Sequence, residues 1–125
     1  MNYDVLVDKA KEAMEKAYAK YSNFKVGTAL LTKSGKIYTG CNIENSSFGA
    51  TICGERVAFV KAISEGDMDF EAIAVVSSSG DYTFPCGICR QFMADFGLDT
   101  KVILNNGKEN KVYTVKDLLP ESFNL

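Results

Sequence analysis

The sequence predicts an α/β protein, a three-layer α/β/α sandwich built around a five-stranded mixed sheet. Helical and strand-like patterns follow one another in the order α-β-β-α-β-α-β-β, and such alternation is typical of a sheet covered by helices. Residues 72–76 form an uninterrupted apolar run, as expected of a strand whose two faces are both covered. We therefore expect helices on the faces of the sheet.

Two helices and a hairpin account for the first half of the chain. Apolar residues recur at three- and four-residue steps over residues 3–18, which predicts an amphipathic helix. Residues 26–31 and 36–41 have the composition of two strands joined by turn residues. Residues 53–65 have helical composition and stop before Gly66, a suitable C-terminal cap.

The second half adds the apolar strand, a short helix and two further strands. The helix follows Pro85–Cys86, runs to about Phe96 and again ends at a glycine, Gly97. The last strands cover residues 101–104 and 110–114 around an Asn-Asn-Gly turn. Residues 115–119 can form a final turn of helix.

Length and composition indicate one catalytic domain over residues 1–125. The 125 residues are 46% hydrophobic and 24% charged, enough for one core and too few for two. The first segment is too charged for a signal peptide, and no apolar run approaches the length of a membrane span. We therefore expect a cytoplasmic protein that does not enter a membrane. In that reducing compartment, cysteines are more often metal ligands, reactive groups or buried thiols than disulfides.

Charge and histidine content narrow the chemistry. The formal net charge is −2, and the lysines and arginines are scattered. No basic stripe could neutralise a row of phosphates, so we do not expect a nucleic-acid partner. The chain contains no histidine. A transition-metal site must therefore use Cys, Asp or Glu, and an acid–base catalyst must be something other than imidazole.

Three cysteines stand at the starts of two predicted helices. Cys53 precedes one helix, and Cys86 and Cys89 open the other in a Pro-Cys-x-x-Cys motif. A helix N-terminus favours thiolate over thiol, so two facing helix starts could hold three thiolates around one divalent cation. Three protein ligands leave tetrahedral zinc one open position, which is typical of catalytic sites. Water bound there loses a proton near neutral pH.

Glu55 follows Cys53 by two residues. Positions i and i+2 point apart on a helix, so we do not expect Glu55 to be a fourth ligand beside Cys53. A carboxylate in the first helical turn can nevertheless hydrogen-bond to a metal-bound water and carry protons. Cys-x-Glu followed by Pro-Cys-x-x-Cys is a signature of zinc deaminases.

Four segments together make the sequence resemble the homotetrameric cytidine deaminases. They are Tyr-Ser-Asn-Phe-Lys-Val-Gly at 21–27, Gly-Cys-Asn-Ile-Glu-Asn at 40–45, and the two cysteine motifs, in the order and spacing of that family. The likeness extends from about Tyr18 to Phe123. It implies a cytidine deaminase-like fold and a role in pyrimidine salvage. The expected reaction is hydrolysis of cytidine and deoxycytidine to uridine and deoxyuridine with release of ammonia.

The resemblance also implies roles for individual residues. Cys53, Cys86 and Cys89 would bind one Zn²⁺ per chain, and Glu55 would shuttle protons. Arg56 would help to neutralise the thiolates, since three of them on Zn²⁺ leave one net negative charge. The implied substrate contacts are Phe24 beside the pyrimidine, Asn42 and Glu44 on the ribose hydroxyls, the backbone at Gly54 and Phe84 near the base, and Phe123 in a neighbouring subunit's site.

Other interpretations of these residues remain open at this point. Cys86 and Cys89 could form a redox pair, or Cys41 could complete a closed four-cysteine site in a module that is not an enzyme. A related aminopyrimidine nucleoside, of the blasticidin class, is a neighbouring substrate hypothesis. Phe48 stands where the family often has tyrosine, and the sequence does not decide whether it contacts substrate.

Overall fold

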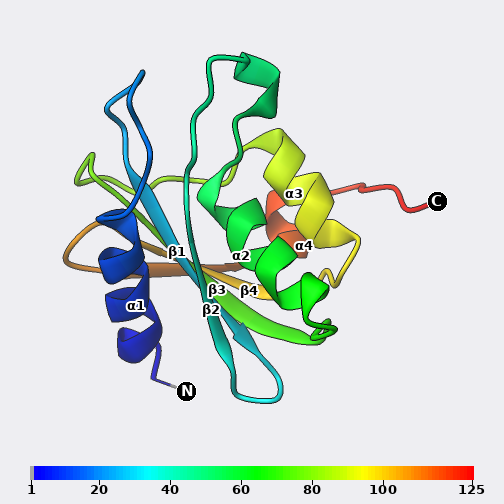
Figure 1. Cartoon of the computed structure of the whole chain (residues 1–125). Coiled ribbons are helices and arrows are strands. Elements are labelled where there is room, and N and C mark those ends of the chain that lie inside the picture. Colours follow the sequence, from blue (N-terminus) through cyan, green and yellow to red (C-terminus); the bar gives the residue numbers. More distant parts are fainter. Residues whose placement is uncertain (1) are drawn as a thin grey trace.

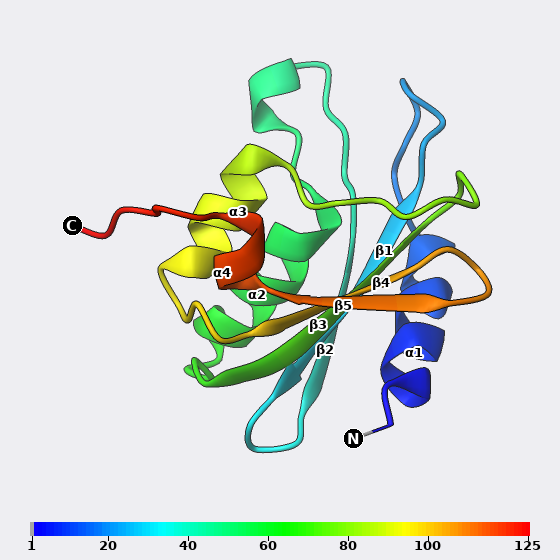
Figure 2. The ribbon, with the colours of Figure 1, turned by 180° about the vertical axis from the view of Figure 1, so that it is seen from behind.

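The computed structural model describes residues 2–125 and contains the predicted sandwich. Helix α1 (Asp4–Met14) covers one face of the sheet, and α2 (Gly54–Ser64) and α3 (Gly87–Ala94) cover the other (Figures 1 and 2). The remaining helical turns are η1 (Phe48–Ala50) and α4 (Val115–Leu118). No helix within residues 2–125 has the length and apolar character needed to cross a membrane.

The sheet has five strands in the order β2-β1-β3-β4-β5. Only β3 and β4 pair in parallel, and the other neighbours are antiparallel, so the sheet is mixed as predicted. The strands are β1 (Val26–Thr32), β2 (Ile37–Cys41), β3 (Phe70–Ser77), β4 (Lys101–Asn105) and β5 (Asn110–Thr114).

The central strand β3 separates two hydrophobic cores. Ile73 and Val75 face the core beneath α2 and α3, whereas Ala72, Ala74 and Val76 face the core beneath α1. Successive side chains of a strand point to opposite faces, so an uninterrupted apolar run serves both cores. The predicted strand covered on both faces is therefore confirmed.

The first helix is shorter than its apolar pattern suggested. It ends at Met14, whereas the pattern continues to Tyr18. The backbone of Tyr18 instead donates to the Asn42 carbonyl at 2.9 Å and accepts from the Glu44 amide at 2.8 Å. This distant pairing takes the place of helical hydrogen bonds, and the prediction of a helix to residue 18 was wrong over its last turn.

Two glycines let the helices approach the sheet. A Cβ atom on Gly27 would lie 2.0 Å from the Ala10 carbonyl oxygen in α1. On the other face, a Cβ atom on Gly40 would lie 2.3 Å from the Gly54 carbonyl oxygen and 2.7 Å from the Ala58 nitrogen. Both separations are shorter than van der Waals contact allows, so the position of the start of α2 depends on the absence of a side chain at residue 40.

We predict that Gly40→Ala destabilises the protein, because its methyl group must displace the backbone of α2. Overpacking of this kind costs about 1–3 kcal/mol. Urea denaturation measures the change as a lower unfolding midpoint. Gly49→Ala is the matched control, since a Cβ atom there meets nothing within 4 Å; equal midpoints for the two variants would contradict the packing argument.

Candidate active site

The starts of α2 and α3 lie at the same end of the sandwich, below the loop that carries η1 (Figure 1). Cys53 and Cys86 are the residues immediately before these helices, and both have extended backbones, with ψ of 152° and 171°. Neither side chain caps its helix. Cys89 follows within the first turn of α3 and is fully buried. The three sulfurs are thus free to face one another.

The three Sγ atoms lie within 4.8 Å of one another, and those of Cys53 and Cys86 are 3.7 Å apart. Zinc binds thiolate sulfur at about 2.3 Å, which in a tetrahedron separates two sulfurs by about 3.8 Å. The spacing therefore fits one zinc ion. Cys41, a free thiol at the end of β2, lies outside this group.

Hydrogen bonds and the charge of Arg56 favour the thiolate form of Cys53. A hydrogen bond with Cys89, aided by Arg56 and Cys86, lowers the pKa of Cys53 to about 5. The same bond to Cys53, together with burial, raises the pKa of Cys89, so the proton stays there when no metal is bound. Nη2 of Arg56 donates to Cys53 Sγ at 3.7 Å, while its buried Nε has no hydrogen-bond partner. Arg56 thus supplies the positive charge nearest to the sulfurs.

Glu55 is the one charged side chain buried among residues 2–125, at 4% exposure. Burial raises the pKa of its carboxyl to about 7, and the negative charge of Cys53 acts in the same direction. A carboxyl with a pKa near the working pH can both accept and donate a proton. The site therefore contains a buried carboxyl whose pKa suits proton transfer, in a chain that has no histidine.

One cavity of about 240 Å³ connects these groups with predicted substrate residues. Its wall includes the sulfur residues Cys53 and Cys86, the acid Glu55 and two aromatic residues from separate loops, Phe24 and Phe84. The rest of the lining is Val26, Asn42, Thr51, Ile52, Gly54 and Thr83.

Asn42 and Glu44 both bind the loop that carries Phe24. The Asn42 side chain accepts from the Val26 amide at 2.9 Å and donates to the Phe24 carbonyl at 2.8 Å. Glu44 accepts from the Tyr21 amide at 2.9 Å. Both side chains therefore serve the same segment, as expected for alternate residues of an extended strand.

Two of the predicted substrate-binding residues, Glu44 and Phe123, lie outside the cavity wall, and the sequence left the role of Phe48 undecided. Glu44 lines an adjoining hollow of about 240 Å³ with Tyr21 and Phe48, and Thr51 lines both spaces. Phe48 itself is 80% exposed. Phe123 is 65% exposed on the C-terminal segment, where its carbonyl accepts from Gln91 Nε2 at 3.2 Å. The structure does not bring Phe123 into the site of its own chain.

The sequence analysis missed five residues of the site. Val26, Thr51, Ile52 and Thr83 line the cavity. The signal for Val26 is its place in the 21–27 motif, and the signal for the other three is that they precede motif residues. Arg90 donates to the carbonyls of Pro85 at 2.7 Å and Leu118 at 2.8 Å, and so ties the start of α3 to α4. Its place beside Cys89 could have pointed to it.

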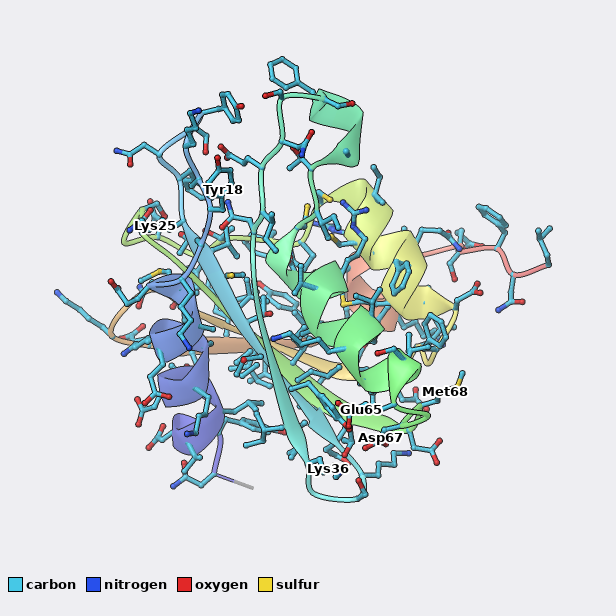
Figure 3. All side chains as sticks on the ribbon, viewed as in Figure 1. Tyr18, Lys25, Lys36, Glu65, Asp67 and Met68 are labelled. Carbon is cyan, nitrogen blue, oxygen red and sulfur yellow. The ribbon has the colours of Figure 1, made fainter. Side chains whose placement is uncertain are left out.

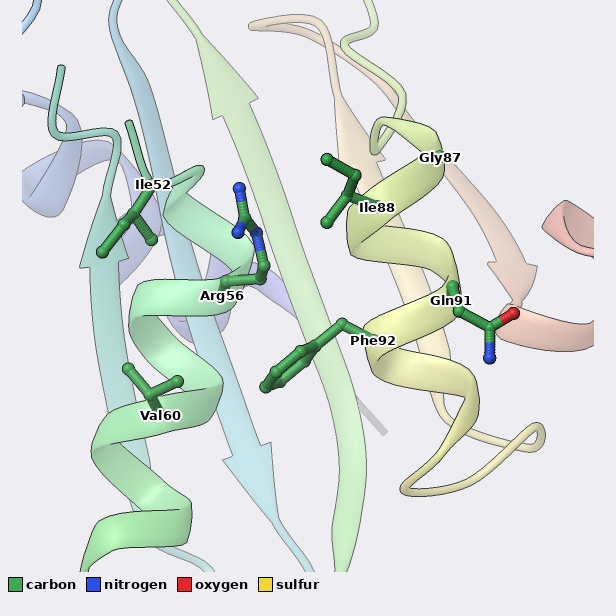
Figure 4. A pocket seen from close by; sticks show the side chains of 7 residues that line it. All are labelled: Ile52, Arg56, Val60, Gly87, Ile88, Gln91 and Phe92. Atoms are coloured by element: carbon green, nitrogen blue, oxygen red, sulfur yellow. The ribbon is translucent and has the colours of Figure 1, made fainter. Parts of the chain in front are cut away.

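A larger groove of about 590 Å³ lies between α2 and α3. Figure 4 shows Ile52, Arg56 and Val60 on one side of it and Ile88 and Phe92 on the other. The groove lining contains no thiol or carboxylate, whereas the smaller cavity is lined by Cys53, Cys86 and Glu55.

Comparison with known proteins agrees with this geometry. Residues 1–105 match the family described as the cytidine and deoxycytidylate deaminase zinc-binding region. A cytidine deaminase from Halalkalibacterium halodurans is 48% identical over 125 residues, which cover 98% of this chain and 95% of that protein. A blasticidin-S deaminase from Bacillus cereus is 35% identical over 119 residues, covering 86% and 84%.

Among solved structures, the crystal structure of cytidine deaminase from Burkholderia pseudomallei has a TM-score of 0.93. It is 45% identical and covers 98% of this chain and 100% of its own. The zinc-binding region accounts for the three clustered thiols, and the likeness extends over nearly the whole fold. This chain belongs to the cytidine and deoxycytidylate deaminase zinc-binding family.

Proposed function

We propose that this protein hydrolyses the 4-amino group of cytidine and deoxycytidine, producing uridine or deoxyuridine and ammonia for pyrimidine salvage. The observation that carries the proposal is the cavity in which two ligand thiols and the buried Glu55 lie beside Phe24 and Phe84. A cavity of about 240 Å³ suits a small ligand, and its walls are mostly apolar with few polar groups, as in other small-molecule sites.

Cys53, Cys86 and Cys89 would hold the zinc ion. When bound, zinc supplies Lewis acidity, which lets water lose a proton near neutral pH. The guanidinium of Arg56 offsets part of the negative charge of the thiolates, and we assign it this charge-tuning role.

Glu55 would move the protons of the reaction. Its carboxylate takes a proton from the attacking water and delivers it to N3 of the pyrimidine as oxygen bonds to C4. It then carries the second proton of that water from the new C4 hydroxyl to the 4-amino nitrogen, so that C4 becomes a carbonyl, the C4–N bond breaks and ammonia leaves. A carboxyl whose pKa is about 7 can perform both transfers.

The remaining cavity residues would bind the nucleoside. Phe24 and Phe84 would flank the pyrimidine, with the backbone at Gly54 and Phe84 near its polar edge. Asn42 and Glu44 would bind the sugar hydroxyls. A blasticidin-type substrate is less favoured, since the B. cereus deaminase is 35% identical and the cytidine deaminase of H. halodurans 48%.

The alternative metal sites are less well supported. A closed four-cysteine site would need Cys41, which lies outside the thiol group. A redox pair would leave the burial of Glu55 and the third clustered thiol unexplained.

We also propose that the protein lies in the cytoplasm, because the ligand thiols must stay reduced to bind zinc.

The proposal is tested by the absorbance change of cytidine and by ammonia release with zinc-loaded protein, with CMP and adenosine as controls. We expect cytidine and deoxycytidine to react. Cys86→Ala should lose both zinc and activity, whereas Cys41→Ser should keep about one zinc per chain. No deamination by protein that contains zinc would refute the proposal, and a folded but metal-free Cys41→Ser would favour the four-cysteine site.

We predict that Glu55→Gln retains zinc but loses turnover by a factor of about 10²–10⁴, the usual effect of removing a positioned proton carrier. Steady-state kinetics with metal analysis measures both quantities. Turnover within a few-fold of the wild type would exclude Glu55 as the proton shuttle.

The same substitution should alter the pH dependence of stability in the metal-free protein. Burial raises the pKa of Glu55 from 4.5 to about 7, so between these values the folded state binds more protons than the unfolded chain. The contribution of Glu55 is therefore complete below pH 4.5 and lost as pH rises through about 7. The urea unfolding midpoint should decrease between pH 5 and pH 8, and this decrease should be smaller for Glu55→Gln than for the wild type. Equal decreases in the two proteins would contradict the buried-carboxyl argument.

We further propose that the enzyme is a homotetramer with shared sites. The groove between α2 and α3 leaves Val60 and Ile88 exposed at 44% and 65%. A second copy would cover such an apolar surface, since symmetric self-association is the usual arrangement. Phe123, exposed and outside its own cavity, would then complete the base pocket of a neighbour.

Mass measurement in solution should give four chains per particle. Phe123→Ala should raise KM by roughly threefold to tenfold, as expected for one lost aromatic contact, with zinc content unchanged. A monomer with full activity at assay concentration would refute the shared pocket.

A further inference from the structure

The loop over residues 21–26 is held at every backbone N–H. Asn23 has a φ of 58°, a left-handed conformation that Asn tolerates better than most residues, and this makes the turn tight. The acceptors, in chain order, are Glu44 Oε1 for Tyr21 and Ser22, Ala19 O for Asn23, Ser22 Oγ for Phe24, Ser78 Oγ for Lys25 and Asn42 Oδ1 for Val26.

Ser22 has a central place in this set of hydrogen bonds. Its hydroxyl oxygen accepts from the Phe24 amide at 3.0 Å. The same hydroxyl donates to Oε2 of Glu44. One small side chain thus joins the residue proposed to flank the pyrimidine to the residue proposed to bind the sugar.

The number of free acceptor positions on the Glu44 carboxylate decides which of its oxygens a ligand hydroxyl can bind. Each carboxylate oxygen has two acceptor positions. Oε1 uses both, on the amides of Tyr21 at 2.9 Å and Ser22 at 3.0 Å. Oε2 uses one, on the Ser22 hydroxyl, and retains one. A hydroxyl of the ligand must therefore bind Oε2, the oxygen that Ser22 orients.

The ionisation of Glu44 is consistent with this arrangement. Hydrogen bonds from the side chain and the backbone of Ser22 hold the pKa of Glu44 below its usual value. The carboxylate is then an acceptor with no proton of its own, and charge-assisted bonds to it are stronger than neutral ones.

We propose that Ser22 is a positioning residue that aims the last free acceptor of Glu44 at a sugar hydroxyl of the substrate. This assignment rests on the nucleoside deamination proposed above. Its particular consequence is that Ser22 acts on the sugar and leaves the chemistry at C4 unchanged.

The test compares kcat/KM for cytidine and for 2′,3′-dideoxycytidine, which lacks both ring hydroxyls. Ser22→Ala should lower the value for cytidine about tenfold, mainly through KM, as expected for one hydrogen bond to a charged group. The value for the dideoxynucleoside should fall by a smaller factor, because for that substrate Ser22→Ala removes only the acceptor of the Phe24 amide, and zinc content should not change. Ser22→Thr keeps the hydroxyl at an exposed position and should restore cytidine turnover.

Ser64→Ala is the matched control. This exposed serine hydrogen-bonds to the Lys61 carbonyl at 2.9 Å and adjoins Glu65, which Figure 3 shows at the opposite end of the molecule from Tyr18 and Lys25. In a Glu44→Gln background, Ser22→Ala should have little further effect on cytidine.

Three outcomes would overturn the assignment. They are equal losses for both nucleosides, no loss for cytidine, and additive losses in the double variant. If the wild type deaminates cytidine and one of these outcomes occurs, the assignment of Ser22 fails and the proposed function stands. A zinc-loaded wild type that does not deaminate cytidine refutes the proposed function, and the assignment of Ser22 with it.

Discussion

The contact between the start of α2 and the β1–β2 hairpin determines where Cys53 and Glu55 lie relative to the sheet. Gly40 has no side chain, so the Gly54 carbonyl can lie where a Cβ atom would otherwise be, and Thr28 Oγ1 donates to that same carbonyl at 2.8 Å. Cys53 and Glu55 flank Gly54. A helix held at this depth therefore puts one ligand and the buried acid at the end of the sheet, facing the start of α3.

Burial of charge is the second constraint, and it follows from the first. A carboxyl at 4% exposure is costly to ionise, and the pKa of Glu55 accordingly rises to about 7. The Cys53 sulfur nearby favours the opposite, since hydrogen bonds from Cys89 and Arg56 stabilise its thiolate and lower its pKa. Within a few residues, the site thus combines the Glu55 carboxyl, which keeps its proton up to about neutral pH, with the thiolate of Cys53. This combination suits metal-assisted hydrolysis.

The loop over residues 21–26, which brings Phe24 to the cavity wall, is held by a different kind of interaction. This loop lies at the surface, where few apolar contacts could hold it, and hydrogen bonds to Asn42, Glu44 and Ser78 order it instead. Such fastening fixes Phe24 without burying it, since this side chain remains 39% exposed. An open, ordered aromatic residue is available to a ligand at little cost in conformational entropy.

The sequence by itself determined the order of the elements, the central apolar strand and the cysteine and glutamate positions of the site. These features are local: Cys-x-Glu and Cys-x-x-Cys place their residues within one helical turn, and an apolar run specifies burial on both faces. The end of α1 at Met14, the entry of Thr83 into the cavity and the sharing of Glu44 by Tyr21 and Ser22 were decided only by the tertiary structure. Each depends on backbone or side-chain groups whose partners lie far along the chain. A local sequence pattern cannot predict those partners, because only the folded sheet brings them together.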